Sequence, residues 1–324
     1  RGTAPVSTTA VSTTAVSTTA VTPSAVTPTS PATIDHRGAP PVSTSRTATT
    51  SRPVTTEYLA DRARFIRTET VRLTRIAGAG HYSAVFSCAE ILAALYYSEL
   101  RIDPARPDMA DRDRFVLSKG HAAIGLYPVL ADLGYFAPAA LEDYTRLGSP
   151  FGDHPDMKRI AGIDFSSGSL GHGLSVAVGM AWAGRYAGHD HRTWCLLGDG
   201  ELAEGQVWEA AMSAAHHRLG DLVAVVDNNQ LGIDGRVAEV MAAEPIEERF
   251  AAFGWQTRRV DGHDLDALLA AFAALPPRGG DRPQLIVADT VKGKGVARME
   301  LSPDWHVGNL VGADYDDVMA ELNR

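Results

Sequence analysis

Hydrophobic and polar positions follow two different spacings along the chain of 324 residues. Apolar residues at helical spacing begin near Thr56 and recur over residues 88–100, whereas short runs rich in β-forming residues occur later. Helical stretches separate these runs, which cover residues 114–117, 193–197, 222–226, 255–260 and 285–288. Such alternation predicts an α/β fold, in which a parallel sheet is flanked by helices on both faces.

The first 56 residues differ in composition from the rest of the chain. They contain the repeat Val-Ser-Thr-Thr-Ala three times over residues 6–20, and Thr-Pro-rich sequence follows. A segment with so few large apolar residues cannot offset the conformational entropy that it would lose on folding. We therefore predict a disordered low-complexity tail over residues 1–56 and one domain over residues 57–324.

Composition and charge narrow the possible partners. The chain is 45% hydrophobic and 21% charged, as is typical of globular proteins, and its net charge is −9. Beyond residue 56 the net charge is −12, from 26 Lys and Arg against 38 Asp and Glu. This acidity disfavours nucleic acid or an anionic membrane as the main partner.

Cys88 and Cys195 lack metal-site spacing, and no apolar stretch reaches the roughly eighteen residues of a membrane span, so we expect a cytoplasmic protein.

Polar residues directly follow two of the predicted strands. Gly198-Asp199-Gly200-Glu201 follows the run 193–197, and Asp227-Asn228-Asn229 follows the run 222–226. Parallel strands end at the same edge of a sheet, so we expect both segments to meet there. The residues between them predict a connecting helix with one apolar face, formed by Trp208, Ala211, Met212, Ala215 and Leu219.

These residue types suit a metal-bound diphosphate. Mg²⁺ prefers octahedral oxygen coordination, which an Asp carboxylate, an Asn carbonyl, a backbone carbonyl and two phosphate oxygens would supply. The glycines beside Asp199 let the backbone approach the phosphates closely, where peptide N–H groups can contact them. Gly-Asp-Gly alone also closes many ordinary turns, so the tripeptide indicates a site only together with its flanking strands.

The two segments together resemble the diphosphate-binding pattern of thiamine diphosphate enzymes, in which GDG is followed by NN at this separation. The resemblance implies two cofactors: thiamine diphosphate and Mg²⁺, or another divalent cation such as Ca²⁺ or Mn²⁺. It also implies that Asp199, Asn229 and the carbonyl of Leu231 are metal ligands. Gly198, Gly200 and Glu201 would belong to the cofactor-binding segment.

Further segments, between about Tyr58 and Gly308, resemble the transketolase family. Four of them carry a histidine: Gly80-His81, Leu117-Ser118-Lys119-Gly120-His121, Gly152-Asp153-His154-Pro155-Asp156 and Trp305-His306. The third resembles the family's Gly-His-Pro-(Glu/Asp). Each histidine taken singly has a plain explanation as a hydrogen-bonded loop residue. Taken together, the four histidines are implied by the resemblance to line a substrate channel. Groups that exchange protons near pH 7 suit a polyhydroxylated sugar in such a channel. The resemblance also implies that His121 contacts the cofactor.

Residues 166–173, Ser-Ser-Gly-Ser-Leu-Gly-His-Gly, resemble the family's Thr-Thr-Gly-Pro-Leu-Gly-Gln-Gly. This resemblance implies that Gly168 and Leu170 lie against the cofactor, with Leu170 on its pyrimidine face. His172 replaces a Gln and is interpreted as a supporting residue. Glu204 resembles the acidic residues that share protons at the transketolase dimer interface, although a solvated helix face would explain Glu204 and Glu209 equally well.

The resemblance implies that a two-carbon ketol unit is transferred from a ketose, or a ketose phosphate, to an aldehyde. In the family, a glutamate of a second domain activates the cofactor. Only about sixteen residues follow the matching region before Arg324, fewer than the roughly 50 that a domain needs. We therefore expect a catalytically incomplete subunit that pairs with a separate pyrimidine-domain chain, as α2β2.

Three alternatives remain open. The α subunit of a 2-oxo-acid dehydrogenase has a similar GDG/NN site, but the Ser-x-Gly-His, Gly-Lys-Gly and Trp-His segments favour transketolases. Deoxyxylulose-phosphate synthase is a closer relative, but its catalytic chain is normally continuous. A non-catalytic scaffold subunit that binds the cofactor is the third, and the presence of Asp199, Asn229 and all four histidines disfavours it. The sequence indicates neither the donor nor the acceptor of the ketol unit. An acceptor bound to a carrier protein is one of the options.

Overall fold

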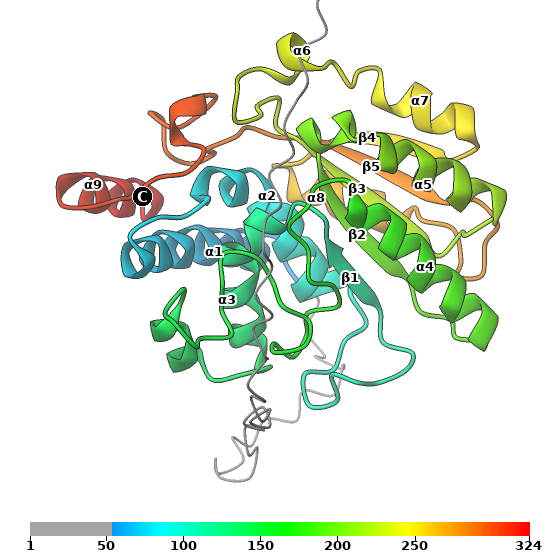
Figure 1. Cartoon of the computed structure of the whole chain (residues 1–324), viewed down its shortest axis with the longest axis horizontal. Coiled ribbons are helices and arrows are strands. Elements are labelled where there is room, and N and C mark those ends of the chain that lie inside the picture. Colours follow the sequence, from blue (N-terminus) through cyan, green and yellow to red (C-terminus); the bar gives the residue numbers. More distant parts are fainter. Residues whose placement is uncertain (1–53) are drawn as a thin grey trace, which may run out of the picture. The chain divides into compact units, whose positions relative to one another are not determined.

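The computed structural model describes residues 54–324, so nearly all of the predicted tail lies outside the described residues. The described part contains a five-stranded sheet in the order β1-β2-β3-β5-β4, with all neighbours parallel (Figure 1). The strands are β1 Arg114–Leu117, β2 Thr193–Gly198, β3 Leu222–Asn228, β4 Gln256–Asp261 and β5 Gln284–Asp289. Each predicted β-rich run coincides with one strand to within two residues, and the predicted α/β fold is confirmed.

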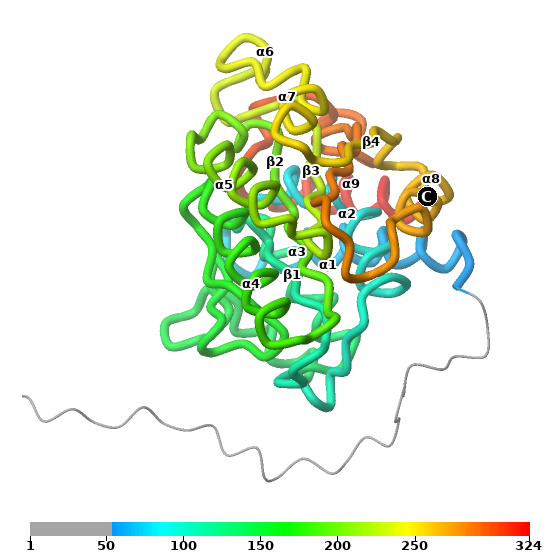
Figure 2. Tube along the Cα trace, turned by 90° about the vertical axis from the view of Figure 1, so that its right-hand side faces the viewer, coloured from blue at the N-terminus to red at the C-terminus, as the bar shows by residue number. Residues whose placement is uncertain are grey.

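Helices cover both faces of the sheet, because successive side chains of a strand point in opposite directions. Trp194 and Leu196 of β2 belong to one apolar core, and Cys195 and Leu197 belong to the other. The first core is covered by α1 Thr56–Ala77, α2 Tyr82–Ala94, α3 Ala123–Leu133 and α8 Leu265–Ala273. The second is covered by α4 His172–Ala187, α5 Gly205–His216 and α7 Ile246–Phe253; Figure 2 shows α4 and α5 on the side of the sheet away from α1 and α2.

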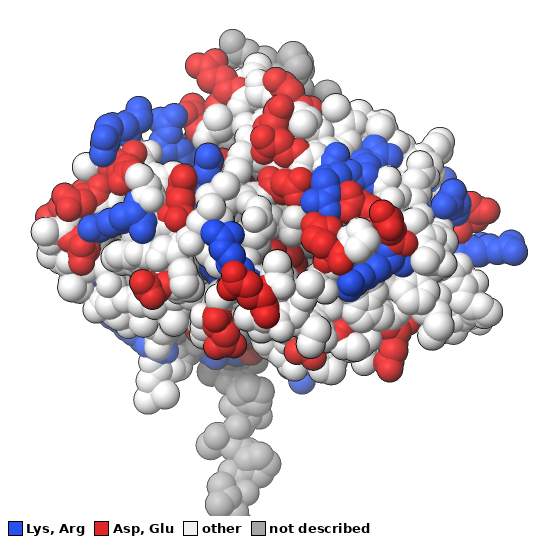
Figure 3. Space-filling model, turned by 90° about the horizontal axis from the view of Figure 1, so that it is seen from above, with Lys and Arg blue, Asp and Glu red and all other residues white. Residues whose placement is uncertain are grey.

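Shorter elements connect these helices and strands. They are the π-helical turn η1 Leu95–Glu99, the 3-10 helices η2 Gly120–Ala122, η3 Pro138–Asp143, η4 Gly200–Ala203 and η5 Pro303–Trp305, and the helices α6 Val237–Val240 and α9 Ala313–Leu322. Helix α9 packs against α1. Within residues 54–324, no helix combines the length and the apolar character that crossing a bilayer requires. Acidic and basic side chains are intermixed on the face shown in Figure 3.

The apolar face predicted for the helix between β2 and β3 is partly wrong. Helix α5 buries Val207, Ala210, Ala211 and Ala214, whereas Met212 is 56% exposed. The buried positions follow the i, i+3, i+4, i+7 spacing of one helix face, and their small side chains bring α5 close to the sheet. The apolar face predicted from the sequence is displaced by about one residue from the face that is buried. The error leaves the loops at either end of the helix unaffected.

The carboxyl ends of the strands lie together at one edge of the sheet, as in other parallel sheets. Main-chain hydrogen bonds join the first residue beyond a strand to the neighbouring strand: the Ser118 N–H donates to the carbonyl of Leu196 in β2 at 2.9 Å, and the Asp199 N–H donates to the carbonyl of Asp227 in β3 at 3.2 Å. The polar segments that the sequence analysis singled out therefore surround one region of the structure.

Candidate active site

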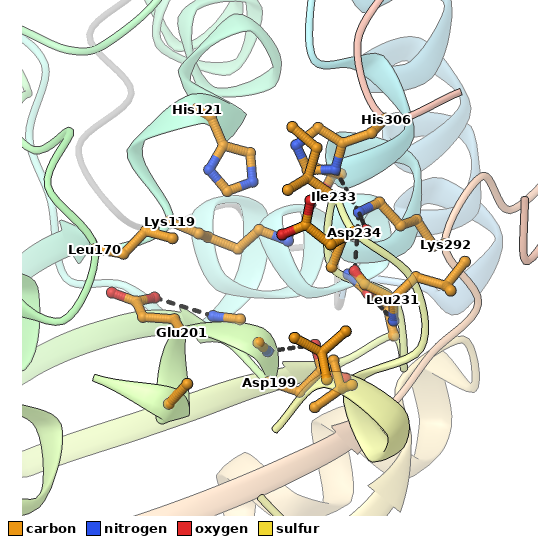
Figure 4. A pocket seen from close by; sticks show the side chains of 18 of the residues that line it. Lys119, His121, Leu170, Asp199, Glu201, Leu231, Ile233, Asp234, Lys292 and His306 are labelled. Carbon is orange, nitrogen blue, oxygen red and sulfur yellow. Dashed lines mark hydrogen bonds between the residues drawn. The ribbon is translucent and has the colours of Figure 1, made fainter. Parts of the chain in front are cut away.

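A cavity of about 390 Å³ lies at this edge of the sheet (Figure 4). Its walls come from the loops after β1, β2, β3 and β5, together with the segments that precede α2 and α4. The residues predicted from the sequence that line it are His81, His121, His154, Gly168, Leu170, Gly198, Asp199, Gly200, Glu201, Asn229, Leu231 and His306. The fold thus brings together every predicted site residue except Glu204.

Asp199 lies immediately after β2 and is 3% exposed. Its Oδ1 accepts a hydrogen bond from the N–H of Gly200 at 2.8 Å, and its Oδ2 accepts one from the N–H of Gln230 at 2.6 Å. The second bond joins the loop after β2 to the loop after β3. Burial, and then the charge of Asp227, raise the pKa of Asp199 to about 6. A cation beside this carboxylate would favour its ionised form.

Asn229 is held with its amide nitrogen toward the interior. Its Nδ2 donates to Oγ of Ser87 at 3.2 Å and to Oδ2 of Asp227 at 3.3 Å. Its Oδ1 accepts from the N–H of Leu231 at 3.2 Å. Asp227 is fully buried and also accepts from the Lys119 ammonium. Burial opposes ionisation of Asp227, but the charge of Lys119 and the hydrogen bonds from Lys119, Ser87 and Thr290 together outweigh burial and lower the pKa of this carboxyl.

Lys292 links the candidate metal ligands to the histidines. Its Nζ donates to the carbonyl oxygens of Leu231 at 2.9 Å and Gly232 at 3.3 Å, and to Nδ1 of His306 at 2.7 Å (Figure 4). Burial, and then the charge of Lys119, lower the pKa of Lys292 to about 8. Lys292 therefore stays mainly protonated at neutral pH and places a cation beside the cavity.

The cavity residues fit a diphosphate that carries a divalent cation. At Gly198 no neighbouring atom lies within 4 Å of where a Cβ would stand, and at Gly200 the nearest such atom is 3.7 Å away, so the main chain is open here. Within residues 54–324, no three or more His, Cys, Asp or Glu side chains are grouped to hold a metal ion. One carboxylate, one amide and one main-chain carbonyl, from Asp199, Asn229 and Leu231, are instead a partial set of oxygen ligands, which phosphate oxygens and water would complete around a bound Mg²⁺.

The four predicted histidines form one cluster. The ring centroid of His81 lies 5.4 Å from that of His121, 6.4 Å from that of His154 and 5.5 Å from that of His306. The rings of His121 and His306 are 5.7 Å apart, and Figure 4 shows them side by side. These residues come from four separate segments of the chain, so only the folded structure brings the imidazoles together.

Two main-chain hydrogen bonds hold part of this cluster in register. The N–H of Gly80 donates to the carbonyl of Gly308 at 3.0 Å, and the N–H of Gly308 donates to the carbonyl of Gly80 at 3.2 Å. The bridge keeps the segments of His81 and His306 next to each other. Burial, and then the charge of Lys292, lower the pKa of His306 to about 3; burial, and then the charge of Lys119, lower the pKa of His121 well below its ordinary value. Both imidazoles are therefore neutral at pH 7.

The glycine-rich run before α4 is a close-packed turn at the cavity. Gly171 has φ +83°, and a Cβ there would lie 2.5 Å from Cβ of Glu204. A Cβ at Gly173 would lie 2.2 Å from Oγ of Ser118. These glycines are required because the start of α4 lies directly against the loops that follow β1 and β2.

The Glu201 carboxylate holds three of these loops together. It accepts hydrogen bonds from the Ser118 hydroxyl, from the N–H of Gly171 at 2.8 Å and from the N–H of Gly198 at 3.1 Å. Burial raises the pKa of this carboxyl. Glu201 lines the cavity while its oxygens bind the protein, so its predicted contact with a cofactor stays a prediction.

Glu204 lies outside the cavity lining, and its side chain is exposed. Glu209 on α5 and His172, the first residue of α4, are exposed as well. A solvated helix end and a surface that a partner covers both agree with this exposure. The proton-sharing role of Glu204 at an interface therefore stays a prediction.

Four residues that contact the candidate site were not selected from the sequence: Lys119, Asp153, Asp227 and Lys292. Lys119 and Asp227 had a usable signal, because each is an ionisable residue at the carboxyl end of an apolar strand. Lys292 stands three residues beyond β5 and had a weaker signal of the same kind. Asp153 differs from the family pattern Gly-His-Pro, but the sequence does not indicate its contact, because the irregular loop between η3 and α4 has no periodicity that shows where its side chains point.

Comparison with known proteins identifies relatives of this arrangement. A family model described as the thiamine diphosphate binding domain of transketolase matches residues 56–322. The 6-deoxy-6-sulfo-D-fructose transketolase subunit SqwG of Clostridium sp. (strain MSTE9) is 40% identical over 266 residues, which cover 82% of this chain and 96% of that relative. One subunit of the apulose-4-phosphate transketolase of Phocaeicola vulgatus is 37% identical over 258 residues, which cover 80% of this chain and 91% of that relative.

Solved structures agree with the sequence relatives. The transketolase of Campylobacter jejuni subsp. jejuni NCTC 11168 matches with a TM-score of 0.78 and 29% identity, covering 83% of this chain. The match covers 43% of that transketolase, so this chain spans less than half of its length. The resemblance found in the sequence motifs is confirmed: the chain belongs to the transketolase family, in which it corresponds to the thiamine diphosphate-binding domain.

Proposed function

We propose that this chain is a subunit of a transferase, a transketolase that depends on thiamine diphosphate and Mg²⁺. The enzyme would pass a two-carbon ketol unit from a ketose, or a ketose phosphate, to an aldehyde. The observation that carries the proposal is one cavity in which Asp199, Asn229 and Leu231 meet the histidine cluster. The first group suits a cation and its diphosphate, and the second suits a polyhydroxylated substrate.

We assign cofactor binding to the loops at the strand ends. Asp199, Asn229 and the carbonyl of Leu231 would hold the cation, while main-chain N–H groups near Gly200 would face the diphosphate. A cation on the Leu231 carbonyl would compete with the hydrogen bond from Lys292, which would free this ammonium for a phosphate oxygen. When bound, thiamine diphosphate supplies the carbon nucleophile that protein side chains lack.

We assign substrate binding to the histidines. A neutral imidazole has one donor and one acceptor nitrogen, so His121 and His306 can each bind a hydroxyl or carbonyl group of a sugar. Gly168 and Leu170 line the same cavity as these histidines and Asp199, and they would contact the cofactor rings there. The histidines would thus hold the sugar close to the cofactor and exchange protons with its oxygens.

We further propose that a separate chain carries the pyrimidine-binding domain, and that the two assemble as α2β2. Two relatives named as subunits support this, because 96% and 91% of their lengths match this chain. Their names give different sugars, 6-deoxy-6-sulfo-D-fructose and apulose-4-phosphate, at similar identities of 40% and 37%. The sequence identity to these relatives therefore does not indicate which sugar is the donor. A sugar phosphate substrate and a cytoplasmic location remain predictions.

Calorimetric titration tests the cofactor site. The purified chain is titrated with thiamine diphosphate in the presence and absence of Mg²⁺, and we expect binding heat only when both are present. Asp199→Ala should abolish this heat, because it removes the carboxylate of the cation site. Asp143→Ala, which removes an exposed carboxylate on η3, should leave it unchanged. Equal heat without Mg²⁺, or with Asp199→Ala, would contradict the proposal, as would no heat at millimolar cofactor.

Turnover tests the reaction and the partner. Ketol transfer from a ketose phosphate to an aldehyde is measured with the chain alone and with the polypeptide that co-purifies with it. Activity that requires both chains supports the proposal. Full activity of this chain alone would refute the two-subunit arrangement. Turnover of pyruvate in place of a ketose would favour a 2-oxo-acid dehydrogenase.

A further inference from the structure

Asp153 lies inside the motif of His154, at a point where the family pattern Gly-His-Pro has no acidic residue between Gly and His. Its Oδ2 lies 3.1 Å from Nδ1 of His81, and its Oδ1 accepts a hydrogen bond from the Tyr144 hydroxyl at 3.4 Å. Oδ2 is 3.9 Å from Nδ1 of His154, too far for a hydrogen bond. Among the four clustered histidines, Asp153 is therefore bonded to His81.

This contact assigns a proton to one nitrogen of His81. Burial alone would raise the pKa of Asp153, but the pKa is lowered overall, chiefly by the hydrogen bond to His81, so the group is ionised at neutral pH. An ionised carboxylate only accepts hydrogen bonds. Nδ1 of His81 must then be the donor, and in the neutral ring Nε2 carries a lone pair.

The free nitrogen of His81 is available to a bound molecule. His81 lines the cavity whereas Asp153 does not, so the ring edge away from Asp153 is the one that reaches the cavity. No residue of the described part, 54–324, donates a hydrogen bond to Nε2 of His81. Its neighbours in the cluster, His121 and His306, contribute ring contacts at centroid distances of 5.4 and 5.5 Å.

His306 has the opposite arrangement. The Lys292 ammonium donates to Nδ1 of His306 at 2.7 Å, so the proton of this neutral ring is on Nε2. The rings of His81 and His306 meet at an interplanar angle of 90°. One ring therefore presents an acceptor nitrogen, and its neighbour presents a donor N–H.

We propose that Asp153 is a positioning residue, which holds His81 in the Nδ1–H tautomer so that His81 accepts, and His306 donates, a hydrogen bond in the same cavity. The ligand chemistry that matches is a carbonyl oxygen next to a hydroxyl group, as in a ketose or a hydroxyaldehyde. The carbonyl would accept from Nε2–H of His306, and the hydroxyl would donate to Nε2 of His81. The choice of a sugar as ligand rests on the proposed function, whereas the tautomer does not.

Nuclear magnetic resonance of the full chain, with ¹⁵N-labelled histidine, tests the tautomer directly. Spectra are recorded at about pH 8, above the ordinary pKa of histidine, and the His81 signals are identified by their loss in His81→Gln. We expect long-range ¹H–¹⁵N correlations that show a protonated Nδ1 and an unprotonated Nε2 for His81. A wild-type His81 protonated on Nε2 would overturn the proposal.

Substitutions of Asp153 distinguish a positioning role from a general loss of structure. Asp153→Ala should move the His81 proton to Nε2, the tautomer that predominates without a partner. Asp153→Asn should retain the Nδ1–H tautomer, because the amide oxygen still accepts a hydrogen bond. Asp143→Ala should leave the His81 signals unchanged. An unchanged His81 tautomer in Asp153→Ala would overturn the proposal; if this variant does not fold, the wild type and Asp153→Asn still decide.

The measurement is independent of the cofactor and of the partner chain. If His81 has the other tautomer while calorimetry shows cofactor binding, the proposal for Asp153 fails and the proposed function stands. If the tautomer is as expected while the cofactor does not bind, the proposed function fails and the role of Asp153 stands.

Discussion

The ammonium of Lys119, a residue that lines the cavity, and the carboxylate of Asp227 form a buried ion pair, in which these residues are 1% and 0% exposed. The ammonium also donates to the carbonyl of Ala84 at 3.0 Å, and the carboxylate accepts from Oγ of Ser87 at 2.6 Å and from the amide of Asn229. Burial disfavours the charged lysine, but the charge and hydrogen bond of Asp227, together with smaller contributions such as the charge of Asp199, outweigh burial and raise the pKa of Lys119. The pair thus connects α2 with the ends of β1 and β3 and contacts the candidate metal ligand Asn229.

Removal of the lysine charge should destabilise the domain strongly. Lys119→Met leaves Asp227 buried without a cation, and breaking a buried pair in this way costs about 3–5 kcal/mol. Urea denaturation measures the free energy of unfolding. The double variant Lys119→Met, Asp227→Asn should lose less than the sum of the two single losses, because the two residues interact. A loss below about 1 kcal/mol in Lys119→Met would show that the pair does not stabilise the fold.

Two glycines of α4 should respond in opposite ways to alanine. A Cβ at Gly173 would lie 2.7 Å from the main-chain Cα of Ser118, so Gly173→Ala should cost about 1–3 kcal/mol and weaken cofactor binding. Gly179 has no neighbouring atom within 4 Å of that position and is exposed, so Gly179→Ala should stabilise the helix by about 0.5–1 kcal/mol. Urea denaturation of both variants compares these effects. Equal effects on stability would contradict the close packing at Gly173.

The stability of the domain should fall in acid partly through Glu90. Its carboxylate accepts two hydrogen bonds from Arg67, both at 2.7 Å, and lies 3.0 Å from Nδ1 of His263. Burial opposes ionisation, but the charge of Arg67 and the hydrogen bonds from Arg67 and His263 together outweigh burial, and the pKa of Glu90 is lowered from 4.5 to about 2. The unfolded chain therefore binds more protons between these values, so this stabilisation is complete above about pH 4.5 and is lost as the pH falls toward about 2.

Glu90→Gln should flatten this pH dependence. The wild-type carboxylate accounts for about 3 kcal/mol of unfolding free energy across the window. Urea denaturation at a series of pH values measures the slope, which should decrease in Glu90→Gln. Glu142→Gln, which changes an exposed acceptor of Arg72, is the matched control and should retain the wild-type slope. An unchanged slope in Glu90→Gln would rule out this source of acid sensitivity.

The predicted interface role of Glu204 has a distinct signature. Because this side chain is exposed, Glu204→Ala should change the unfolding free energy of the isolated chain by no more than about 0.5 kcal/mol. Assembly with the co-purifying partner should weaken at least roughly tenfold, since truncation of a charge buried by an interface costs about 2–5 kcal/mol. Sedimentation velocity measures the assembly. Wild-type assembly in Glu204→Ala would leave Glu204 as a solvated residue.

Much of the fold and of the candidate cation site could be predicted from the sequence. The strand ending at Leu117 and the one starting at Leu222 lie where their apolar runs predicted them, because a strand's composition is a local property. Asp199 and Asn229 follow two parallel strands, so the edge at which they meet follows from topology. Hydrophobic periodicity could not predict the histidine cluster, because the histidine motifs lie in loops. Only their resemblance to transketolases linked these motifs.

The sequence by itself determined the order of strands and helices and the residues that follow each strand, since these depend on hydrophobic spacing and on neighbours in the chain. Only the tertiary structure decided which face of α5 is buried and which polar groups pair. Asp153 bonds to His81 across 72 positions, and Lys119 bonds to Asp227 across 108. Such pairs depend on the packing of loops and helices whose relative orientation no local pattern encodes. The proton positions of the histidines follow from these pairs, so they too are properties of the folded chain.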